Sequence, residues 1–373
     1  MPPCRASFRS TSFSAILGCL VIVSFSASAK AQIRGYLTSS EAALPFAPLP
    51  ADPHELANGG VQVASTPTDR LAAFNLLRKA AENSVSHRPK MEPFSFKVSF
   101  TATGNVSYTG SGELTEIWMS GQNWRVTERL GGWAMVRTGY SGKATDQQPV
   151  SMIPMRAQML RNEVMWATSI NAIGARQIRA VAAQWNSQPV TCILLSSEAG
   201  TGAQTTSRSW DENEYCIDSN ARLQIHSIVP GTYAVFGYSK NSQFHGKPMA
   251  DRIAIYVNGE EVIDSSFSIS DPSADDQALL APPQTAARRP SVALSMPGKI
   301  PINIEAGATG NTIEPVILHA QLDSHGAVME TEVSATADPA LTQRAVDTVK
   351  AMNFGGGGMS HAYFIVRFLP AAQ

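Results

Sequence analysis

The residues whose chemistry is easiest to assign are two cysteines, Cys192 and Cys216. The other two cysteines, Cys4 and Cys19, lie in an N-terminal stretch with the features of an export signal. Cys192 and Cys216 both fall in strand-like stretches, and neighbouring strands bring Cα atoms to the distance that a disulfide spans. Because an oxidising compartment favours this bond, we expect one disulfide; two separately buried thiols are the alternative.

The sequence carries no motif of a common catalytic or cofactor site. It has no G-x-x-x-x-G-K-[ST] phosphate loop, no G-x-S-x-G nucleophile turn and no H-E-x-x-H zinc helix. Four scattered histidines are expected at surface or turn positions instead of around a metal ion: His226, His245, His319 and His361. A general acid and a general base that come together only in the folded chain leave no motif in the sequence. We therefore expect a protein that is not an enzyme and has no metal or other cofactor.

Charge and composition narrow the function classes further. Lys plus Arg number 29 and Asp plus Glu number 30, and no basic stripe stands out, so the chain lacks the field that holds nucleic acid. Charged residues make up only 16% of the chain, which favours sheets with polar outer faces over long charged helices. The length of 373 residues suits two modest domains. We expect an α+β protein without a nucleic-acid partner.

Residues 1–31 have the pattern of a secretory signal peptide. Arg5 and Arg9 precede an apolar run at residues 15–23, and small residues then supply a cleavage pattern. A retained anchor is one alternative, although the run is about half of the roughly 20 residues that a spanning helix needs. A lipoprotein signal at Cys19 is the other. We expect export to the periplasm or cell envelope, and membrane anchoring stays open.

A large, mainly antiparallel sheet decorated by helices is expected over residues 67–270, after a flexible segment at residues 32–66. Its first strand alternates polar residues with four large apolar ones: Phe94, Phe96, Val98 and Phe100. Residues 155–185 lack alternation and predict a helix that is interrupted near Gly174. Asn258-Gly259 predicts a two-residue hairpin turn between the last two strands.

Several short motifs of this domain are shared with a known family. A helix is followed by Phe-x-Phe-x-Val-x-Phe, by residues 112–118 with Trp124-Arg125, and later by Tyr215-Cys216-Ile217-Asp218. This pattern resembles the half-barrel fold of outer-membrane lipoprotein carriers (LolA/LolB-like). The resemblance implies a curved sheet around an apolar cavity for a lipid or another apolar ligand, with six lining residues: Phe94, Phe96, Val98, Phe100, Leu114 and Trp118. The alternative is that these side chains fill the core. A large exposed apolar cavity would favour a carrier, and a filled core would weaken it.

A smaller unit with the order β-β-α-β is expected over residues 301–373, after a Pro- and Ala-rich linker at residues 271–300. Its elements are strands at residues 316–322 and 327–334, a helix that begins at Asp338-Pro339, and a closing strand at residues 362–368.

The smaller unit resembles the TonB C-terminal domain family. The most specific motif is Asp338-Pro339-Ala340-Leu341, followed at helical spacing by Ala345 and Val349 and then by Phe354. Residues 355–358 depart from the family, because glycines replace its usual Lys-Pro-Ala-type stretch. The N-terminal apolar segment also lacks the histidine that the family's membrane anchor normally carries.

The TonB resemblance implies a binding edge on this unit. In that family a short segment of an outer-membrane transporter joins the edge of the sheet as an added strand. The matching edge strand here consists of Ala362, Tyr363, Phe364, Ile365, Val366, Arg367 and Phe368. Arg367 is placed to meet an acidic side chain of the partner. The alternative is an internal strand whose aromatic residues pack against the helix.

These features predict a non-catalytic envelope protein that binds an outer-membrane transporter or another envelope protein by strand addition, within transmembrane transport. The first alternative is a periplasmic carrier of a lipid or lipoprotein acyl chain in the large domain. A third interpretation is a structural protein that uses the C-terminal fold as a stable end piece.

Overall fold

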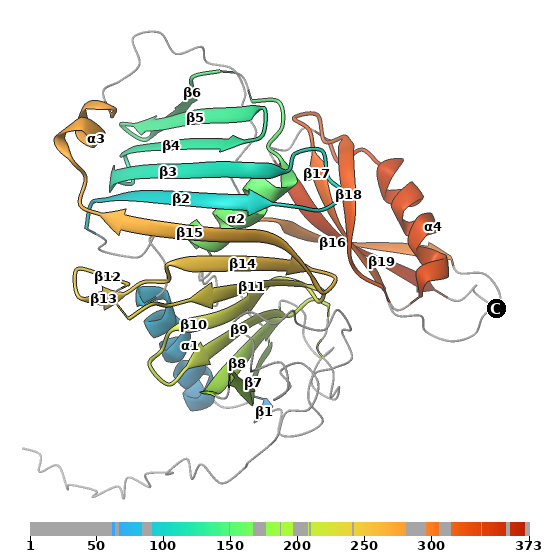
Figure 1. Ribbon diagram of the computed structural model, residues 1–373. Coiled ribbons are helices and arrows are strands. Elements are labelled where there is room, and N and C mark those ends of the chain that lie inside the picture. The colour runs from blue at the N-terminus through green and yellow to red at the C-terminus, as the bar shows by residue number, and fades with distance from the viewer. Residues whose placement is uncertain are drawn as a thin grey trace, which may run out of the picture. The chain divides into compact units, whose positions relative to one another are not determined.

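The computed structural model describes residues 62–63, 67–83, 92–148, 150–166, 177–186, 188–196, 208, 210–240, 242–280, 296–305, 315–336, 338–355 and 359–369 (Figure 1). The expected signal peptide at residues 1–31 lies outside the described residues, as do most of the segment at 32–66 and the middle of the linker. All described residues belong to one compact unit, Ala31–Gln373. Within them, no helix combines the length and the apolar character needed to cross a membrane.

Thirteen strands pair into one sheet, in the order β1-β7-β8-β9-β10-β11-β14-β15-β2-β3-β4-β5-β6 (Figure 1). They are β1 (Gln62–Val63), β2 (Phe94–Ala102), β3 (Gly110–Ser120), β4 (Asn123–Leu130), β5 (Trp133–Tyr140), β6 (Lys143–Asp146), β7 (Gln177–Trp185), β8 (Gln188–Ser196), β9 (Asn213–Asp218), β10 (Leu223–Ser227), β11 (Thr232–Gly237), β14 (Arg252–Val257) and β15 (Glu260–Ser270). All pairings in this large sheet are antiparallel. The outermost strands do not pair with each other, so the sheet is open. The expected antiparallel, helix-decorated sheet is therefore confirmed.

The hairpin β14–β15 joins the end of the large domain to its beginning. Its turn residues Asn258 and Gly259 both have positive φ, 51° and 81°, as a type I′ turn requires. Strand β15 then pairs with β2 over eight residue pairs. A separate two-stranded ribbon, β12 (Gln243–Phe244) with β13 (Lys247–Pro248), precedes this hairpin.

Helices α1 (Pro67–Glu82) and α2 (Met155–Trp166) pack on the same face of the large sheet, which we call the inner face. Helix α1 contributes Ala73, Leu77 and Ala80 to the core there. Helix α2 contacts β4, β14 and β15, and every side chain from residue 155 to 165 is buried. A helix that is buried all round must be covered from more than one side.

The helix expected over residues 155–185 is wrong in its second half. Helix α2 ends at Trp166, and residues 177–185 form strand β7, which pairs with β8 over nine residue pairs. Alternate burial is present in β7, but alanines occupy exposed as well as buried positions, such as Ala182 and Ala183, and this low apolar contrast hides the period of two. The break expected near Gly174 lies outside the described residues.

A second sheet of four strands, the C-terminal sheet, has the order β16-β19-β17-β18. It consists of β16 (Gly298–Glu305), β17 (Val316–Leu322), β18 (Val328–Ala335) and β19 (His361–Leu369), with helix α4 (Pro339–Lys350) between the last two. The Asp338 carboxylate caps this helix by accepting a hydrogen bond from the Ala340 backbone N–H at 2.9 Å. The expected order β-β-α-β is confirmed from β17 to β19.

The expected position of the last strand at a sheet edge is wrong. Strand β19 pairs with β17 on one side and with β16 in parallel on the other, over eight residue pairs. Strand β16 begins at Gly298, inside the expected linker, which also contains helix α3 (Ala274–Ala278). Six residues of the predicted binding edge are buried: Ala362, Tyr363, Phe364, Ile365, Val366 and Phe368. Arg367 lies over the ring of Trp210, 4.8 Å from its centre. The internal-strand alternative is correct.

Candidate functional site

The six predicted lining residues all lie on β2 and β3 and belong to the core on the inner face. Five are at most 4% exposed: Phe94, Phe96, Val98, Phe100 and Leu114. Trp118 is partly buried, and its ring stacks on Phe94 with 5.7 Å between ring centres. The strand alternation therefore identified the residues of the inner face correctly, but they line a filled interior instead of an exposed cavity.

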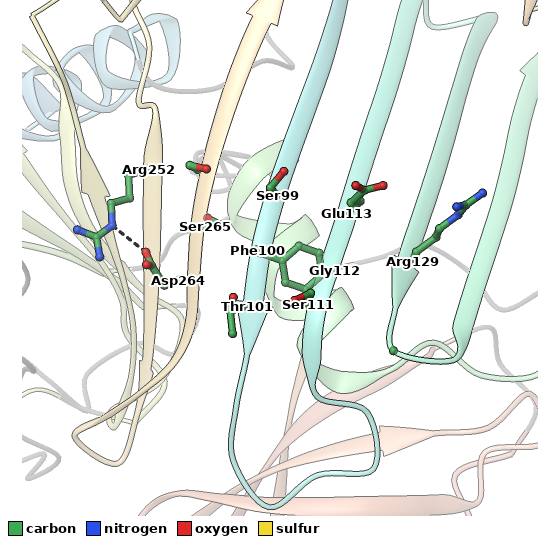
Figure 2. A pocket seen from close by; sticks show the side chains of 12 residues that line it. Ser99, Phe100, Thr101, Ser111, Gly112, Glu113, Arg129, Arg252, Asp264 and Ser265 are labelled. Atoms are coloured by element: carbon green, nitrogen blue, oxygen red, sulfur yellow. Dashed lines mark hydrogen bonds and ion pairs between the residues drawn. The ribbon is translucent and has the colours of Figure 1, made fainter.

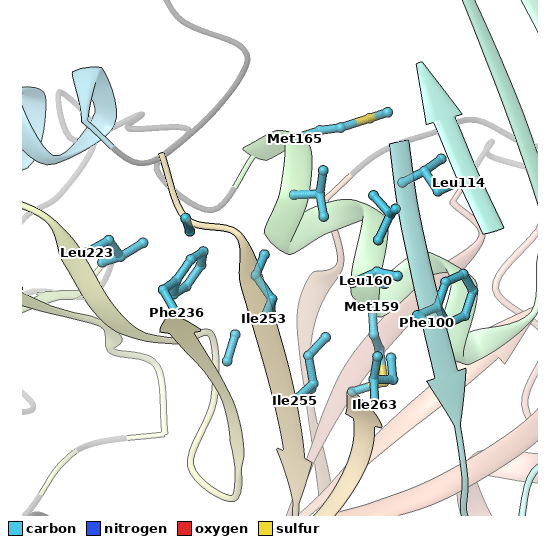
Figure 3. Close-up of a cluster of buried hydrophobic side chains, with 14 of the residues drawn as sticks. Phe100, Leu114, Met159, Leu160, Met165, Leu223, Phe236, Ile253, Ile255 and Ile263 are labelled. Atoms are coloured by element: carbon cyan, nitrogen blue, oxygen red, sulfur yellow. The ribbon is translucent and has the colours of Figure 1, made fainter. Parts of the chain in front are cut away.

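Helix α2 fills the space in front of these residues. Its Met159, Leu160 and Met165 lie among Phe100 and Leu114 on one side and Ile253, Ile255 and Ile263 on the other (Figure 3). We call this cluster the apolar interior. Because methionine is unbranched and polarizable, such a wall adapts its shape more readily than one made of branched side chains.

A buried ion pair also fixes α2 to the large sheet. An Arg161 guanidinium N–H donates to the Glu128 carboxylate of β4 at 2.6 Å, and both side chains are fully buried. Burial raises the pKa of Glu128, although the charge of Arg161 and its hydrogen bond act in the opposite direction. A second polar contact joins α2 to the large sheet, because Glu163 Oε2 lies 2.7 Å from His226 Nδ1 on β10. These contacts determine where the helix lies along the strands.

The opposite side of α2 meets the C-terminal sheet through polar groups. Two Arg156 nitrogens donate to the two Glu332 carboxylate oxygens of β18, each at 2.6 Å. Gln158 donates to the Ser360 carbonyl at 3.2 Å and accepts from its hydroxyl. Asn162 donates through Nδ2 to His361 Nε2 of β19 at 3.0 Å. We call these residues, together with His319, the α2 seam.

A histidine pair extends the α2 seam into the C-terminal sheet. His361 Nδ1 lies 2.9 Å from His319 Nε2 on β17, and His319 stacks on Tyr363 with 4.5 Å between ring centres. The pKa of His319 is well below its ordinary value, because burial, then His361 and Arg156, disfavour its charged form. Burial likewise raises the pKa of Tyr363.

A small cavity of about 10 Å³ lies at the junction of α2, the large sheet and β19. Asn162, Glu163, Thr232, His361 and Tyr363 contribute its polar lining. A cavity of this size accommodates about one water molecule at most. The junction is therefore closed to any larger ligand in this state.

The surface position expected for the histidines is wrong for three of the four. His226, His319 and His361 are buried, while His245 is partly exposed between Glu92 and Asp271. The signal that could have indicated burial was present for two of them. His319 stands between Leu318 and Ala320, and His361 precedes the apolar stretch that begins at Ala362, so a buried strand position was available to both.

The predicted disulfide between Cys192 and Cys216 is confirmed, and it crosses directly between β8 and β9. These two sulfurs and the Glu214 carboxylate are close enough together to form a metal-type cluster among the described residues. Because the sulfurs are bonded to each other, neither offers a thiolate, so this group does not fit a metal ion.

A polar hollow of about 620 Å³ lies on the outer face of β14, β15, β2, β3 and β4 (Figure 2). Short hydroxyl side chains lie along its middle, with charged side chains toward its two ends: Ser99, Thr101, Ser111, Ser266, Glu113, Arg129, Arg252 and Asp264. Arg252 donates to Asp264 at 2.7 Å. The hollow offers hydrogen bonds but little apolar surface, so it does not suit an acyl chain.

Comparison with known proteins gives weak structural neighbours only. No protein-family model matches the chain, and no curated protein matches it. A LolA superfamily protein from Nitrosomonas europaea is 12% identical, with a TM-score of 0.35 over 55% of this chain and 96% of that one. A putative outer-membrane lipoprotein-sorting protein domain from Vibrio parahaemolyticus is 13% identical, with a TM-score of 0.32 over 57% and 97%.

LprF from Mycobacterium bovis is a further neighbour, at 10% identity and a TM-score of 0.21 over 53% of this chain and 92% of that one. None of these three is a TonB C-terminal domain. Structures that overlap with TM-scores this low do not establish a common fold or ligand.

Proposed function

We propose that this protein is a non-catalytic binding protein of the cell envelope, which holds an apolar chain, such as the acyl chain of a lipid or lipoprotein, between the inner face of its large sheet and helix α2. One observation carries the proposal. The inner face is lined by large apolar side chains, and a single methionine-bearing helix covers the centre of that lining. A ligand gains access when α2 moves away from β14 and β15.

The energies involved make this exchange feasible. Burial of a methylene group contributes about 0.8 kcal/mol, so a chain of about twelve methylenes contributes roughly 10 kcal/mol before the cost of binding. Displacement of α2 exposes apolar side chains, and the ligand then covers them. The net free energy of this exchange is therefore much smaller than the cost of exposing these side chains or the gain from covering them. Met159 and Met165 support the proposal because methionines repack around variable shapes.

The test is photo-crosslinking with a diazirine-labelled palmitate and mapping of the labelled peptides by mass spectrometry. We expect label on α2 and β2, and weaker labelling in Leu160→Gln, which introduces a polar amide into the apolar interior. Ser99→Gln on the outer face is the matched control and should label like the wild type. Circular dichroism checks that both variants are folded. Label confined to the polar hollow, or equal labelling of Leu160→Gln, would contradict the proposal.

Strand addition to the C-terminal sheet is the second candidate, and strand β16 favours it. This segment pairs in parallel with β19 over eight residues, so that side of β19 can take up an extended chain. The two outer strands are less suited. Pro301 lacks a backbone N–H in β16, and the pairing of β18 with β17 is irregular at two points. A transporter segment or another envelope protein would therefore have to displace β16.

Strand addition in place of β16 makes a separate prediction. A cysteine pair that links Ile302 of β16 to Val366 of β19, which are register partners, should block partner capture in its oxidised form and restore it on mild reduction. Partner capture from an outer-membrane extract that is unaffected by this link would exclude displacement of β16.

A further inference from the structure

Helix α2 is held on two sides by interactions of different kinds. The apolar interior and the Arg161–Glu128 pair attach it to the large sheet. The α2 seam attaches it to the C-terminal sheet through Arg156, Gln158 and Asn162. The helix can leave the inner face only if these seam contacts are released, because the C-terminal sheet covers its polar side.

The hydrogen bonds of the seam require neutral histidines. Asn162 Nδ2 donates to His361 Nε2, so the proton of a neutral His361 lies on Nδ1 and points at His319 Nε2. His319 then accepts at Nε2 and carries its own proton on Nδ1, where no partner is present within the described structure. A second proton on His361 would oppose the Asn162 donor. A second proton on His319 would oppose the His361 donor.

The charges around His319 do not compensate an added proton. From α2, Arg156 and Glu163 face this region; Glu332 faces it from β18, Tyr363 from β19 and His226 from β10. Glu332 is already bound by both Arg156 nitrogens, and Glu163 is 2.7 Å from His226. An imidazolium at His319 would be buried close to Arg156, and the hydrogen bond of its ring leads to His361 and not to a carboxylate.

We propose that the C-terminal sheet is a proton-sensitive latch on helix α2, in which uptake of a proton by His319 opposes the His361 donor, breaks the α2 seam and permits the helix to leave the inner face. The use of this latch for ligand exchange rests on the proposed function. The latch itself does not, because it concerns only the attachment of α2.

The size of the effect follows from proton linkage. An opened seam exposes His319, which then titrates near pH 6.5, while the closed seam disfavours its charged form. Each histidine that takes up a proton only on opening therefore raises the open population about tenfold for each pH unit below that value. Above pH 7 the latch stays closed.

The experiment is hydrogen–deuterium exchange of the full chain, without ligand, at pH 7.5 and 5.5, each corrected for intrinsic exchange. We expect α2 to lose about tenfold in protection at the lower pH, while β2 keeps its protection. The double variant His319→Gln/His361→Gln should lose this pH dependence. The matched control is His325→Gln, whose histidine lies on a turn of the same sheet with 85% of its side chain exposed, and it should respond like the wild type.

An unchanged α2 at pH 5.5, or an equal response in the double variant, would overturn the latch. If the double variant does not fold, the pH dependence of α2 protection in the wild-type protein tests the latch by itself. Loss of protection restricted to α2 and β19 supports the latch, and equal loss in β2 overturns it. A failure of palmitate crosslinking with an intact pH response would remove the proposed function and leave the latch in place.

Discussion

The two sides of helix α2 differ in the forces that hold them. Toward the large sheet, the helix presents mainly apolar side chains such as Met159 and Leu160, together with one buried ion pair. Toward the C-terminal sheet, it presents an arginine, a glutamine and an asparagine. Apolar contacts do not depend on pH, whereas buried hydrogen bonds and ion pairs depend on the charge state of their partners. In the two proposals above, one side accommodates a ligand and the other controls access to it.

Breaking the Arg161–Glu128 pair should have the largest effect, because it leaves a buried group without its partner. Arg161→Met leaves the Glu128 carboxyl buried without its partner, and we expect a loss of about 3–5 kcal/mol in the free energy of unfolding by urea. The double variant Arg161→Met/Glu128→Leu should recover most of this loss. A single variant as stable as the wild type would contradict the assigned burial of the pair.

The apolar side can be tested by truncation. Leu160→Ala should lower the free energy of unfolding by about 2–5 kcal/mol, because Leu160 is fully buried between α2 and the sheet. Leu71→Ala on α1 is the matched control, since Leu71 is 59% exposed, and it should change stability by less than about 0.5 kcal/mol. Equal effects of the two truncations would mean that α2 does not cover the inner face.

A substitution in the α2 seam should lower the free energy of unfolding less than one in the apolar interior, and it should increase the release of α2 more. Glu332→Gln leaves the Arg156 charge buried without a carboxylate and should cost about 1–3 kcal/mol in the free energy of unfolding. It should also increase exchange of α2 at pH 7.5 while protection of β2 is retained. Equal loss of protection in β2 would indicate global destabilisation instead of release of the helix.

The smallest effect is the pH dependence of stability. Because the pKa of His319 is lowered in the folded state, the unfolded chain takes up a proton as pH falls below about 6.5 while the folded chain does not. Stability is therefore complete above this pH and declines below it, by up to about 1.4 kcal/mol per pH unit. Urea unfolding at pH 7.5, 6.5 and 5.5 should give a flatter slope for His319→Gln. Identical slopes would contradict the burial of an uncharged His319.

Local patterns predicted much of the fold. The strict alternation of Phe94 to Phe100 identified the inner face, and Asn258-Gly259 identified the closing hairpin. The cap at Asp338 identified the start of α4. Each of these features depends on residues that are close together in the sequence, so periodicity and turn chemistry are sufficient to predict them.

The predictions that were wrong concern contacts between parts of the chain that are distant in the sequence. Whether β19 is an edge strand is decided by β16, which lies about 60 positions earlier and carries Pro301, a residue that argues against a strand. The burial of His319 and His361 is decided by α2, which packs on the other sheet. The filled interior likewise required knowing that α2 lies across the inner face, which no local period encodes.

The most direct test of the account compares an acylated peptide with the same peptide lacking its acyl chain, by hydrogen–deuterium exchange of the wild-type protein. If the apolar interior takes up the chain by displacing α2, the acylated peptide alone should increase exchange in residues 155–166 while β2 stays protected. Saturable binding of the acylated peptide with no change in α2, or with changes confined to the polar hollow, would contradict the account.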